Sequence, residues 1–312
     1  MLSKKEISKT KRRKLNKSQM ELWALTIPAI IFVFIFSYLP MGGLVVAFKN
    51  YNYTDGIFGS PWNGLDNFAY LFKSNSFFVI VRNTLLYNFA FILLGTIIAV
   101  FCALMLYAIY NKYAIKIFQS SMFVPYVISW VVVSYISHGF LSYDYGLVNN
   151  LLEFFGKEKI SFYTQKVYWP YILIFFNMWK CVGYNTLMYY GSMLGIDQEL
   201  YEAATIDGCS YFKKIIYITI PGIKPILIMM FILGLGGIFR SDFGLFYYIP
   251  KDSGSLYSVT DVIDTYVMRT IQVTGSIGES SAVGFVQSIV GFITVVAANS
   301  AIKKISEENA LI

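Results

Sequence analysis

Residues 79–109 read VIVRNTLLYNFAFILLGTIIAVFCALMLYAI, an apolar run that is long enough for a helix to cross a membrane. A helix needs about 20 apolar residues to span the roughly 30 Å of hydrocarbon in a bilayer. Similar runs recur along this chain of 312 residues, of which 56% are hydrophobic and only 14% are charged. Soluble domains carry about 25% charged residues. The sequence therefore predicts an all-α integral membrane protein.

The apolar runs and the polar breaks between them predict about six membrane-spanning helices. The expected spans are 22–48, 79–109, 117–139, 167–190, 222–248 and 281–302. An even number of spans places both termini on one side of the membrane. Excess Lys and Arg marks the cytoplasmic side, and basic residues occur in the N-terminal tail, after the second span and after the last span. We therefore expect a cytoplasmic basic tail at 1–21, a membrane domain at 22–302 and a cytoplasmic tail at 303–312.

The net charge of +7 is concentrated in the N-terminal tail. Against the single acid Glu6, the tail carries the basic residues Lys4, Lys5, Lys9, Lys11, Arg12, Arg13, Lys14 and Lys17. The apolar run that follows has no convincing small-residue cleavage site, which predicts a retained first span and not a signal peptide. The tail also lacks the interleaved aromatic residues of a base-stacking surface. We expect contacts with membrane lipids and no binding of nucleic acid.

The most informative connection is the predicted cytoplasmic loop 191–221. Residues 199–225 read ELYEAATIDGCSYFKKIIYITIPGIKP, which predicts a short helix, a turn at Gly208 and a second amphipathic segment from Tyr211 to Ile220. Glycine tolerates the left-handed conformation that ends a helix. Pro221 suits the first turn of the next helix, where no amide hydrogen is needed. The loop is expected to form a helix, a sharp turn and a second helix.

This loop is also the predicted docking surface for a second protein. The small side chains of Ala203 and Ala204 allow the first helix to approach a groove closely, while Glu202 and Asp207 can contact its polar rim. The predicted docking residues are Glu202, Ala203, Ala204, Asp207, Gly208, Tyr211, Phe212 and Pro221. The alternative interpretation is an ordinary amphipathic connection between two spans.

Residues of this loop resemble the EAA motif of binding-protein-dependent ABC importer permeases. The matching residues are Glu202, Ala203, Ala204, Gly208, Ile218, Ile220 and Pro221. Ile220 stands where the family usually has leucine, a change that keeps volume and apolarity. FGSPWNGLDNF at 58–68 and AVGFVQSIVGF at 282–292 are similar to the maltose-permease-like carbohydrate uptake family. Within that family the chain is most similar to the LplB-like polysaccharide/oligosaccharide subgroup, which implies the type I ABC importer permease fold.

The resemblance implies a transport subunit that is not an enzyme and that passes an oligosaccharide or other complex carbohydrate. In the family, the loop is the coupling helix that lies in a cleft of a separate ATP-binding subunit. The implied partners are two such subunits, a second homologous permease in a heterodimer, and an extracellular sugar-binding lipoprotein at the bacterial plasma membrane. ATP and Mg would be held by the ATP-binding subunit. We expect no cofactor and no metal on this chain, which lacks the G-x-x-x-x-G-K-[ST] phosphate loop.

Polar and aromatic residues inside the predicted spans are the candidates for a substrate path. A charge at the bilayer centre costs about 2.5–3.5 kcal/mol and so tends to face a cavity or a partner. Sugar sites generally combine such polar groups with flat aromatic side chains. The candidates are Trp130, Asn177, Trp179, Tyr184, Arg240, Asp242 and Gln287. Packing in the core, contact with lipid, and a pair between Arg240 and Asp242 or with a partner subunit are the alternative interpretations.

Two other classes of protein have features that we do not find clearly in this sequence. An ion-coupled secondary transporter would show an inverted repeat and broken helices that carry carboxylates near mid-membrane. A membrane enzyme such as a glycosyltransferase would need a cluster of carboxylates or histidines at one membrane face, whereas we expect Asp261 and Asp264 to be isolated and solvated or interfacial. The cysteines Cys102, Cys181 and Cys209 are odd in number and far apart, so they predict neither a disulfide framework nor a metal site.

Overall fold

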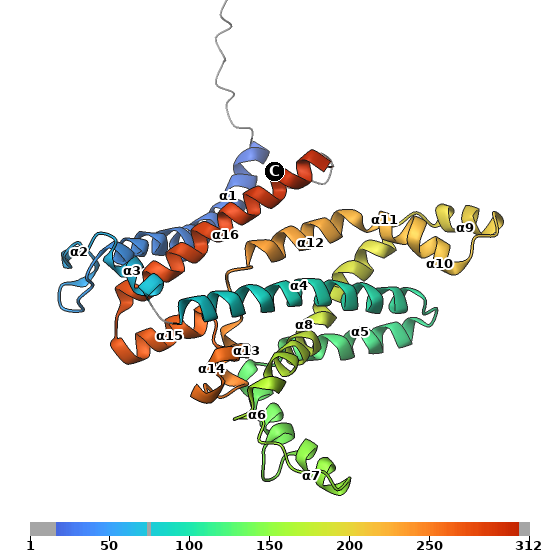
Figure 1. Ribbon diagram of the computed structural model, residues 1–312. Helices are drawn as coiled ribbons and strands as arrows, with labels where there is room; N and C mark the ends of the chain where they lie inside the picture. The colour runs from blue at the N-terminus through green and yellow to red at the C-terminus, as the bar shows by residue number, and fades with distance from the viewer. Residues whose placement is uncertain (1–16, 74–75, 306–312) are drawn as a thin grey trace, which may run out of the picture.

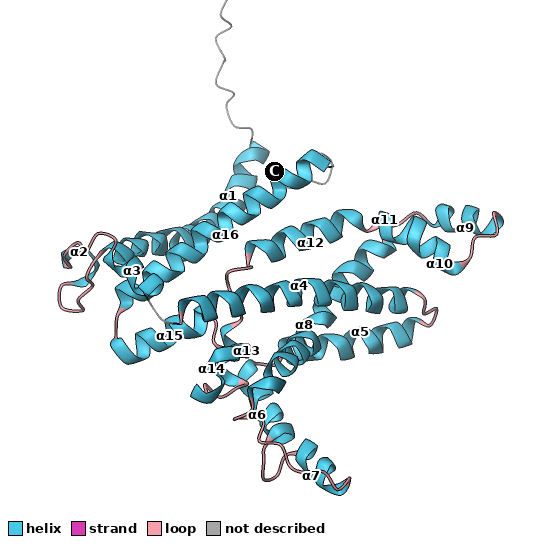
Figure 2. Ribbon diagram, viewed as in Figure 1, coloured by secondary structure: helices cyan, strands magenta, loops and turns pink. Residues whose placement is uncertain are grey.

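The computed structural model describes residues 17–73 and 76–305, and these residues are almost entirely helical (Figure 2). Extended pairing within the described ranges is limited to one isolated bridge between Lys49 and Trp62. The all-α prediction is therefore confirmed. Most of the predicted basic tail and the end of the predicted C-terminal tail lie outside the described residues.

Three predicted spans are formed by continuous helical segments. The first is Glu21–Phe48, which comprises most of α1 (Lys17–Val33), the π-helical turn Phe34–Tyr38 and the 3-10 helix Leu39–Phe48. The others are α4 (Phe77–Tyr107) and α16 (Ile277–Ile305). These bounds lie within a few residues of the predicted ones, because a long uninterrupted apolar run leaves a helix as the only structure that satisfies its own backbone in lipid.

The predicted third span is not one helix. It consists of α5 (Lys112–Val127) and α6 (Trp130–Leu141), whose axes differ by 98°. Pro125 lies in the last turn of α5, where a proline removes a helical hydrogen bond. Ser129 then caps α6 by accepting the amide hydrogen of Val132. Apolarity continues across this break, which is why composition alone predicts a single span.

The predicted fifth span is also wrong as a single helix. The helical segment Tyr211–Gly222 meets α12 (Lys224–Gly236) at a bend of 58°. The helix then ends at Gly236, and the non-helical residues 237–242 lead to α13 (Phe243–Tyr248). Glycine has a high conformational entropy and weakens a helix interior, and α12 ends among three glycines, Gly234, Gly236 and Gly237.

The predicted fourth span is α8 (Trp169–Leu194), which lies against both α4 and α5. It has 26 residues and is about 39 Å long at 1.5 Å per residue. Among the described helices, three single helices and two bent pairs are apolar and long enough to span a membrane, and α8 is not in that set. Its polar residues Asn177, Lys180 and Thr186 are instead buried inside the protein.

The ends of the long helices separate two groups of connections (Figure 1). The short link 108–111 between α4 and α5 lies at the same end as α9 (Gln198–Ile206) and α10 (Tyr211–Lys214). The segments α2 (Gly56–Gly59), α3 (Asp66–Lys73) and α15 (Ile263–Thr274) lie at the opposite end. This arrangement agrees with the predicted alternation of connections along the chain.

Two buried clusters hold the centre of the molecule together. One joins α4, α6, α8 and α13 through residues such as Tyr87, Trp169 and Phe246. The other joins α4, α8 and α12 and includes Tyr189 and Met193. The α8 helix belongs to both clusters, so it is the element against which the other helices are positioned.

The acids near α15 are not solvated as predicted. Asp261 is only 5% exposed and forms an ion pair with Arg269, and it accepts a hydrogen bond of 2.6 Å from the Thr265 hydroxyl. Arg269 also pairs with Asp252 at 2.9 Å. Burial raises the pKa of Asp261, and the Thr265 hydroxyl and the Arg269 guanidinium oppose that rise. The acid is therefore part of a structural network at this end of the molecule.

Candidate functional site

The predicted docking loop forms a helical hairpin of α9 and α10. Asp197 begins α9 by accepting the amide hydrogen of Glu199 at 3.0 Å. The helix ends at Ile206, and Gly208 adopts a φ of 70°. This left-handed conformation strongly favours glycine, so the predicted role of Gly208 in the turn is confirmed.

Side chains fasten the two arms of the hairpin to each other and to α4. The Tyr201 hydroxyl lies 2.9 Å from Thr219 Oγ1, and Lys214 Nζ donates to Thr205 Oγ1 at 2.6 Å. Gln198 Nε2 donates to the hydroxyl of Tyr107, at the end of α4, at 3.0 Å. Burial raises the pKa of Tyr201, and the hydrogen bond with Thr219 opposes that rise. These contacts restrain the position of the hairpin relative to the neighbouring helices.

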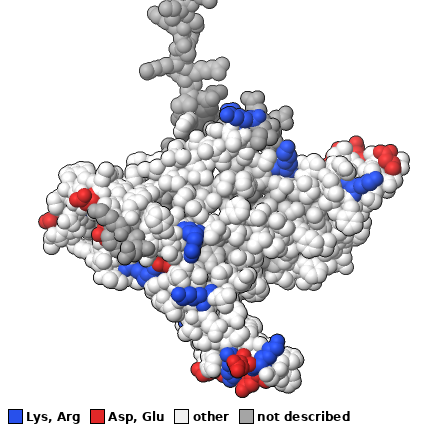
Figure 3. Space-filling model, in the orientation of Figure 1, with Lys and Arg blue, Asp and Glu red and all other residues white. Residues whose placement is uncertain are grey.

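Most of the predicted docking residues lie on the exposed surface of this hairpin. Glu202, Ala203, Asp207, Gly208, Tyr211, Phe212 and Pro221 are exposed, and Ala204 is half-buried. Ile206 is 87% exposed and Phe212 is 75% exposed. Figure 3 shows acidic and basic side chains together at this projecting end. The sequence analysis missed Ile206, whose side chain extends the apolar part of this surface.

Pro221 lies in the first turn of a helix, as predicted, but that helix is not the start of a separate span. This short helix, α11 (Ile220–Gly222), continues the helical run from Tyr211. A π-helical turn, Ile215–Thr219, immediately precedes this proline. Such turns shift the hydrogen-bond register of a helix, and the chain bends only after Gly222. The docking hairpin and the fifth span are therefore joined by helix.

Removing the Tyr201 hydroxyl should loosen the hairpin without unfolding the membrane domain. We expect Tyr201→Phe to cost about 1 kcal/mol, the usual net value of one hydrogen bond, and to increase amide hydrogen exchange in α9. Hydrogen–deuterium exchange with mass spectrometry measures this. The matched control is Tyr217→Phe, which removes the hydroxyl of a 74% exposed tyrosine in the same hairpin. Equal exchange in α9 for both variants would contradict the bracing role.

A polar cavity of about 300 Å³ lies between α4, α8 and α12. Its polar lining comes from Asn88 and Thr96 of α4 and from Asn177, Asn185 and Tyr189 of α8. Apolar residues of α12, including Met230 and Leu233, close the other side. Asparagine amides both donate and accept hydrogen bonds, so this cavity offers paired partners for hydroxyl groups. Of the predicted path residues, the structure places Asn177 here.

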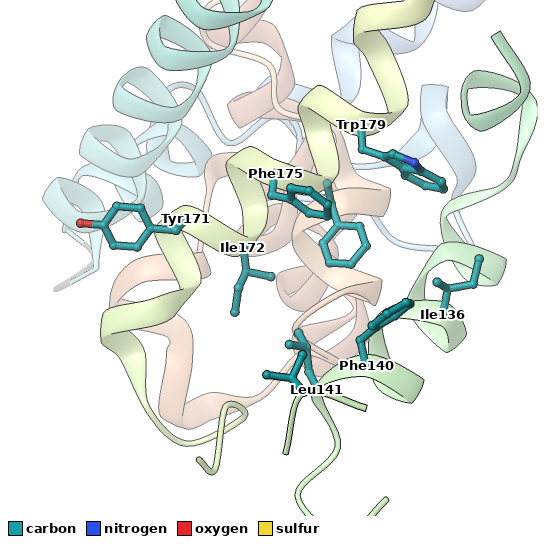
Figure 4. A pocket seen from close by; sticks show the side chains of 9 residues that line it. Ile136, Phe140, Leu141, Tyr171, Ile172, Phe175 and Trp179 are labelled. Carbon is teal, nitrogen blue, oxygen red and sulfur yellow. The ribbon is translucent and has the colours of Figure 1, made fainter. Parts of the chain in front are cut away.

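Two aromatic candidates lie elsewhere. Trp179 lines an apolar pocket of about 560 Å³ between α6 and α8, together with Phe140 and Phe175 (Figure 4). Tyr184 stacks on Tyr126, with the ring centroids 4.8 Å apart. Neither Trp179 nor Tyr184 is among the residues that line the polar cavity with Asn177. The predicted combination of aromatic rings and polar side chains in one cavity is therefore not found there.

Trp130 and Asp242 form a bridge between α6 and α13. The indole Nε1 of Trp130 donates to Asp242 Oδ2 at 2.6 Å, and Asp242 also caps α13 by accepting the amide hydrogen of Gly244 at 2.9 Å. The ammonium of Lys180 lies 5.1 Å from the centroid of the Trp130 ring. These groups connect the break between α5 and α6 to the outer part of the fifth span.

Arg240 and Gln287 each form a hydrogen bond between the non-helical residues 237–242 and α16. Arg240 Nη2 donates to Ser288 Oγ at 2.9 Å, and Gln287 Nε2 donates to the carbonyl oxygen of Phe239 at 2.7 Å. Within the described part of the chain, Arg240 and Asp242 form no ion pair with each other. The ion pair between Arg240 and Asp242, one of the alternative interpretations of these residues, is therefore not present there.

Comparison with known proteins gives a consistent match. Residues 92–307 match the model of the family described as "Binding-protein-dependent transport system inner membrane component". The polygalacturonan/rhamnogalacturonan transport system permease protein YteP of Bacillus subtilis is 33% identical over 93% of this chain and 90% of its own length. Protein LplB of the same organism is 32% identical, over 92% of this chain and 90% of its own length.

Solved structures give the same result. The chain is similar to a chain of a bacterial ABC transporter involved in the import of the acidic polysaccharide alginate, with a TM-score of 0.82, 32% identity, and coverage of 93% of this chain and 97% of that chain. A second structure shows the bacterial alginate ABC transporter in complex with its alginate pentasaccharide-bound periplasmic protein, at a TM-score of 0.82, 31% identity, and coverage of 93% and 96%.

Proposed function

The chain belongs to the family of binding-protein-dependent transport system inner membrane components, and we propose that it is the permease subunit of an ATP-driven importer of a carbohydrate. It is a transport subunit, and ATP with Mg is bound and hydrolysed on a partner. Its cargo is an oligosaccharide or other complex carbohydrate, as the names of its relatives and of the similar alginate importer suggest. An extracellular binding protein delivers the cargo, by analogy with the alginate complex.

The hairpin of α9 and α10 is the docking site for the ATP-binding subunit in this proposal. Its projecting end combines the exposed apolar side chains of Ile206 and Phe212 with the charged side chains of Glu202 and Asp207. Interfaces commonly have an apolar centre with a polar rim, and this end has both. The complete importer would contain two ATP-binding subunits and a second homologous permease in a heterodimer.

The continuity between the hairpin and the cavity is the observation that carries the mechanism. The helical run Tyr211–Gly222 starts in the docking hairpin and meets α12 at the 58° bend. Residues of α12, including Met230 and Leu233, line the polar cavity. A movement of the ATP-binding subunit against α9 would therefore reach the cavity wall through helices, and alternating access would follow from two arrangements of α12 relative to α8.

The membrane placement follows the same proposal. The hairpin end lies in the bacterial cytoplasm, with both termini on that side, and residues 22–302 form the multi-pass permease domain in the plasma membrane. Exposed apolar side chains along Glu21–Phe48, of which Leu25 is 79% exposed, suit contact with lipid or with the second permease. The tails at 1–21 and 303–312 are cytoplasmic.

Charge reversal in the hairpin tests the docking site. We expect Glu202→Lys to lower the amount of ATP-binding subunit that co-purifies with the chain by about tenfold, because it reverses a charge in the polar rim of the docking surface. Gly208→Arg should do the same, because it places a bulky side chain at a left-handed turn. The measurement is quantitative co-purification after co-expression with the neighbouring transporter genes.

The matched control is Glu158→Lys, the same charge change at an exposed position in the connection between α7 (Leu147–Phe154) and α8. It should retain the ATP-binding subunit as the original chain does. If the original chain retains no ATP-binding subunit while it inserts in the membrane, the importer proposal fails and an ion-coupled secondary transporter becomes the better interpretation.

A further inference from the structure

The non-helical link 237–242 interrupts the fifth span, and its backbone is held by side chains from three other helices. Asn88 of α4 donates to the carbonyl oxygens of Ile238 at 2.9 Å and Arg240 at 3.0 Å. Gln287 of α16 donates to Phe239, and Asp264 of α15 accepts the amide hydrogen of Ser241 at 2.7 Å. The unwound conformation is therefore built into the fold and is not a frayed helix end.

Unwound backbone inside a membrane domain is tolerated where it is buried in protein or lines a water-filled cavity. Here Asn88, which holds the link, also lines the polar cavity. The link thus lies next to the cavity, and the two share one side chain. In secondary transporters, which are a different class, interrupted membrane helices form the sites that bind polar cargo groups.

Arg240 gives this link a positive charge that the protein leaves accessible. Its side chain is exposed, and its hydrogen bond to Ser288 Oγ uses one of its five N–H donors. Asp264 and Asp242 lie near it, and within the described residues neither forms an ion pair with Arg240. Asp264 is within electrostatic reach of Arg240 but accepts from Ser241 and Gln287, while Asp242 accepts from Trp130 and caps α13.

We propose that Arg240 binds a carboxylate of the cargo, so that this permease passes oligosaccharides that contain acidic sugar residues. The inference rests on the proposed function and specifies its substrate class. A guanidinium matches a carboxylate with two parallel hydrogen bonds, and the neighbouring amides of Asn88, Asn177 and Asn185 bind the hydroxyl groups of the same chain of sugars. Arg240 is thereby the residue that distinguishes an acidic oligosaccharide from a neutral one of equal length.

Uptake from a mixed library tests this assignment. Cells that carry the complete transporter are given oligogalacturonides and galacto-oligosaccharides of matched length, and the sugars taken up are identified by mass spectrometry. We expect the acidic members to enter with the original chain, and Arg240→Gln to lower their uptake by about tenfold or more, as expected for a lost charge-assisted pair. Arg240→Lys keeps the charge without the planar fork and should give an intermediate loss.

Lys157→Gln is the matched control, because Lys157 is exposed in the connection that follows α7 and its substitution removes the same charge. It should leave uptake unchanged. Entry of only neutral members, or equal uptake of acidic members by Arg240→Gln and the original chain, overturns the assignment and leaves the importer intact. Entry of no member overturns both the assignment and the carbohydrate importer. Co-purification of the ATP-binding subunit with Arg240→Gln should equal that of the original chain, which separates a cargo defect from a docking defect.

Discussion

Gly183→Ala is expected to prevent formation of a stable membrane domain, although it adds only one methyl group. A Cβ atom built at Gly183 would lie 1.7 Å from the carbonyl oxygen of Met122 and 2.4 Å from its carbonyl carbon. These are backbone atoms of α5, so no rotamer change can relieve the contact. Overpacking in a core costs about 1–3 kcal/mol when side chains can move, and the cost here should reach or exceed that range.

The measurement is the yield of monodisperse protein after detergent extraction, followed by its thermal unfolding. Gly191→Ala is the matched control on the same helix, because a Cβ at Gly191 has no atom within 4 Å. The control should match the original chain in both measurements. If Gly183→Ala were extracted in equal yield and unfolded at the same temperature, the close approach of α8 to α5 would be contradicted.

Lys180→Met is expected to have the second-largest effect, by opening the break between α5 and α6. The Lys180 side chain is 8% exposed. Its ammonium donates to the carbonyl oxygens of Pro125 at 3.2 Å, Tyr126 at 2.9 Å and Ile128. Methionine fills a similar volume but leaves these acceptors without that donor. Each unsatisfied buried group costs about 1–3 kcal/mol, so the loss should be several kcal/mol.

Thermal unfolding in detergent measures this loss, and carbohydrate uptake by the complete transporter measures its consequence. Lys180→Arg keeps a positive charge with several donors and should recover part of the stability, whereas Lys157→Met removes an exposed lysine and should have no effect on either measurement. Equal stability of Lys180→Met and the original chain would show that water satisfies the carbonyl oxygens at the break.

The sequence predicted the continuous helices well and the broken ones poorly, for a physical reason. A long apolar run indicates that a segment is removed from water. Such runs predict the long helices α4 and α16 directly. Apolarity does not report where a helix is interrupted. Pro125 and Ser129 did carry a local signal for the break between α5 and α6, since proline disfavours a helix interior and serine favours a helix start.

The helix–turn–helix conformation of α9 and α10 could be predicted because its determinants are local. Gly208 ends α9 through its own backbone conformation, and the residues around it face solvent. The contacts of the polar residues inside the spans could not be predicted in the same way. Lys180 satisfies backbone carbonyls 52 to 55 residues away, and such partners leave no trace in the local sequence. Asp261 was misjudged because its burial involves a distant part of the chain, where Asn83 of α4 donates to the Asp261 carbonyl oxygen at 2.9 Å.

In the proposed mechanism, the bend at Ile223 would determine the direction in which a movement of the hairpin reaches the cavity. Ile223 is fully buried, and the helical run Tyr211–Gly222 leaves it at 58° to α12. At that angle, a thrust along the first helix has a larger component across α12 than along it. Under the proposed function, a displacement along the first helix would therefore tilt α12. Because Met230 and Leu233 of α12 line the polar cavity beside α8, a small displacement of the hairpin would change the width of that cavity.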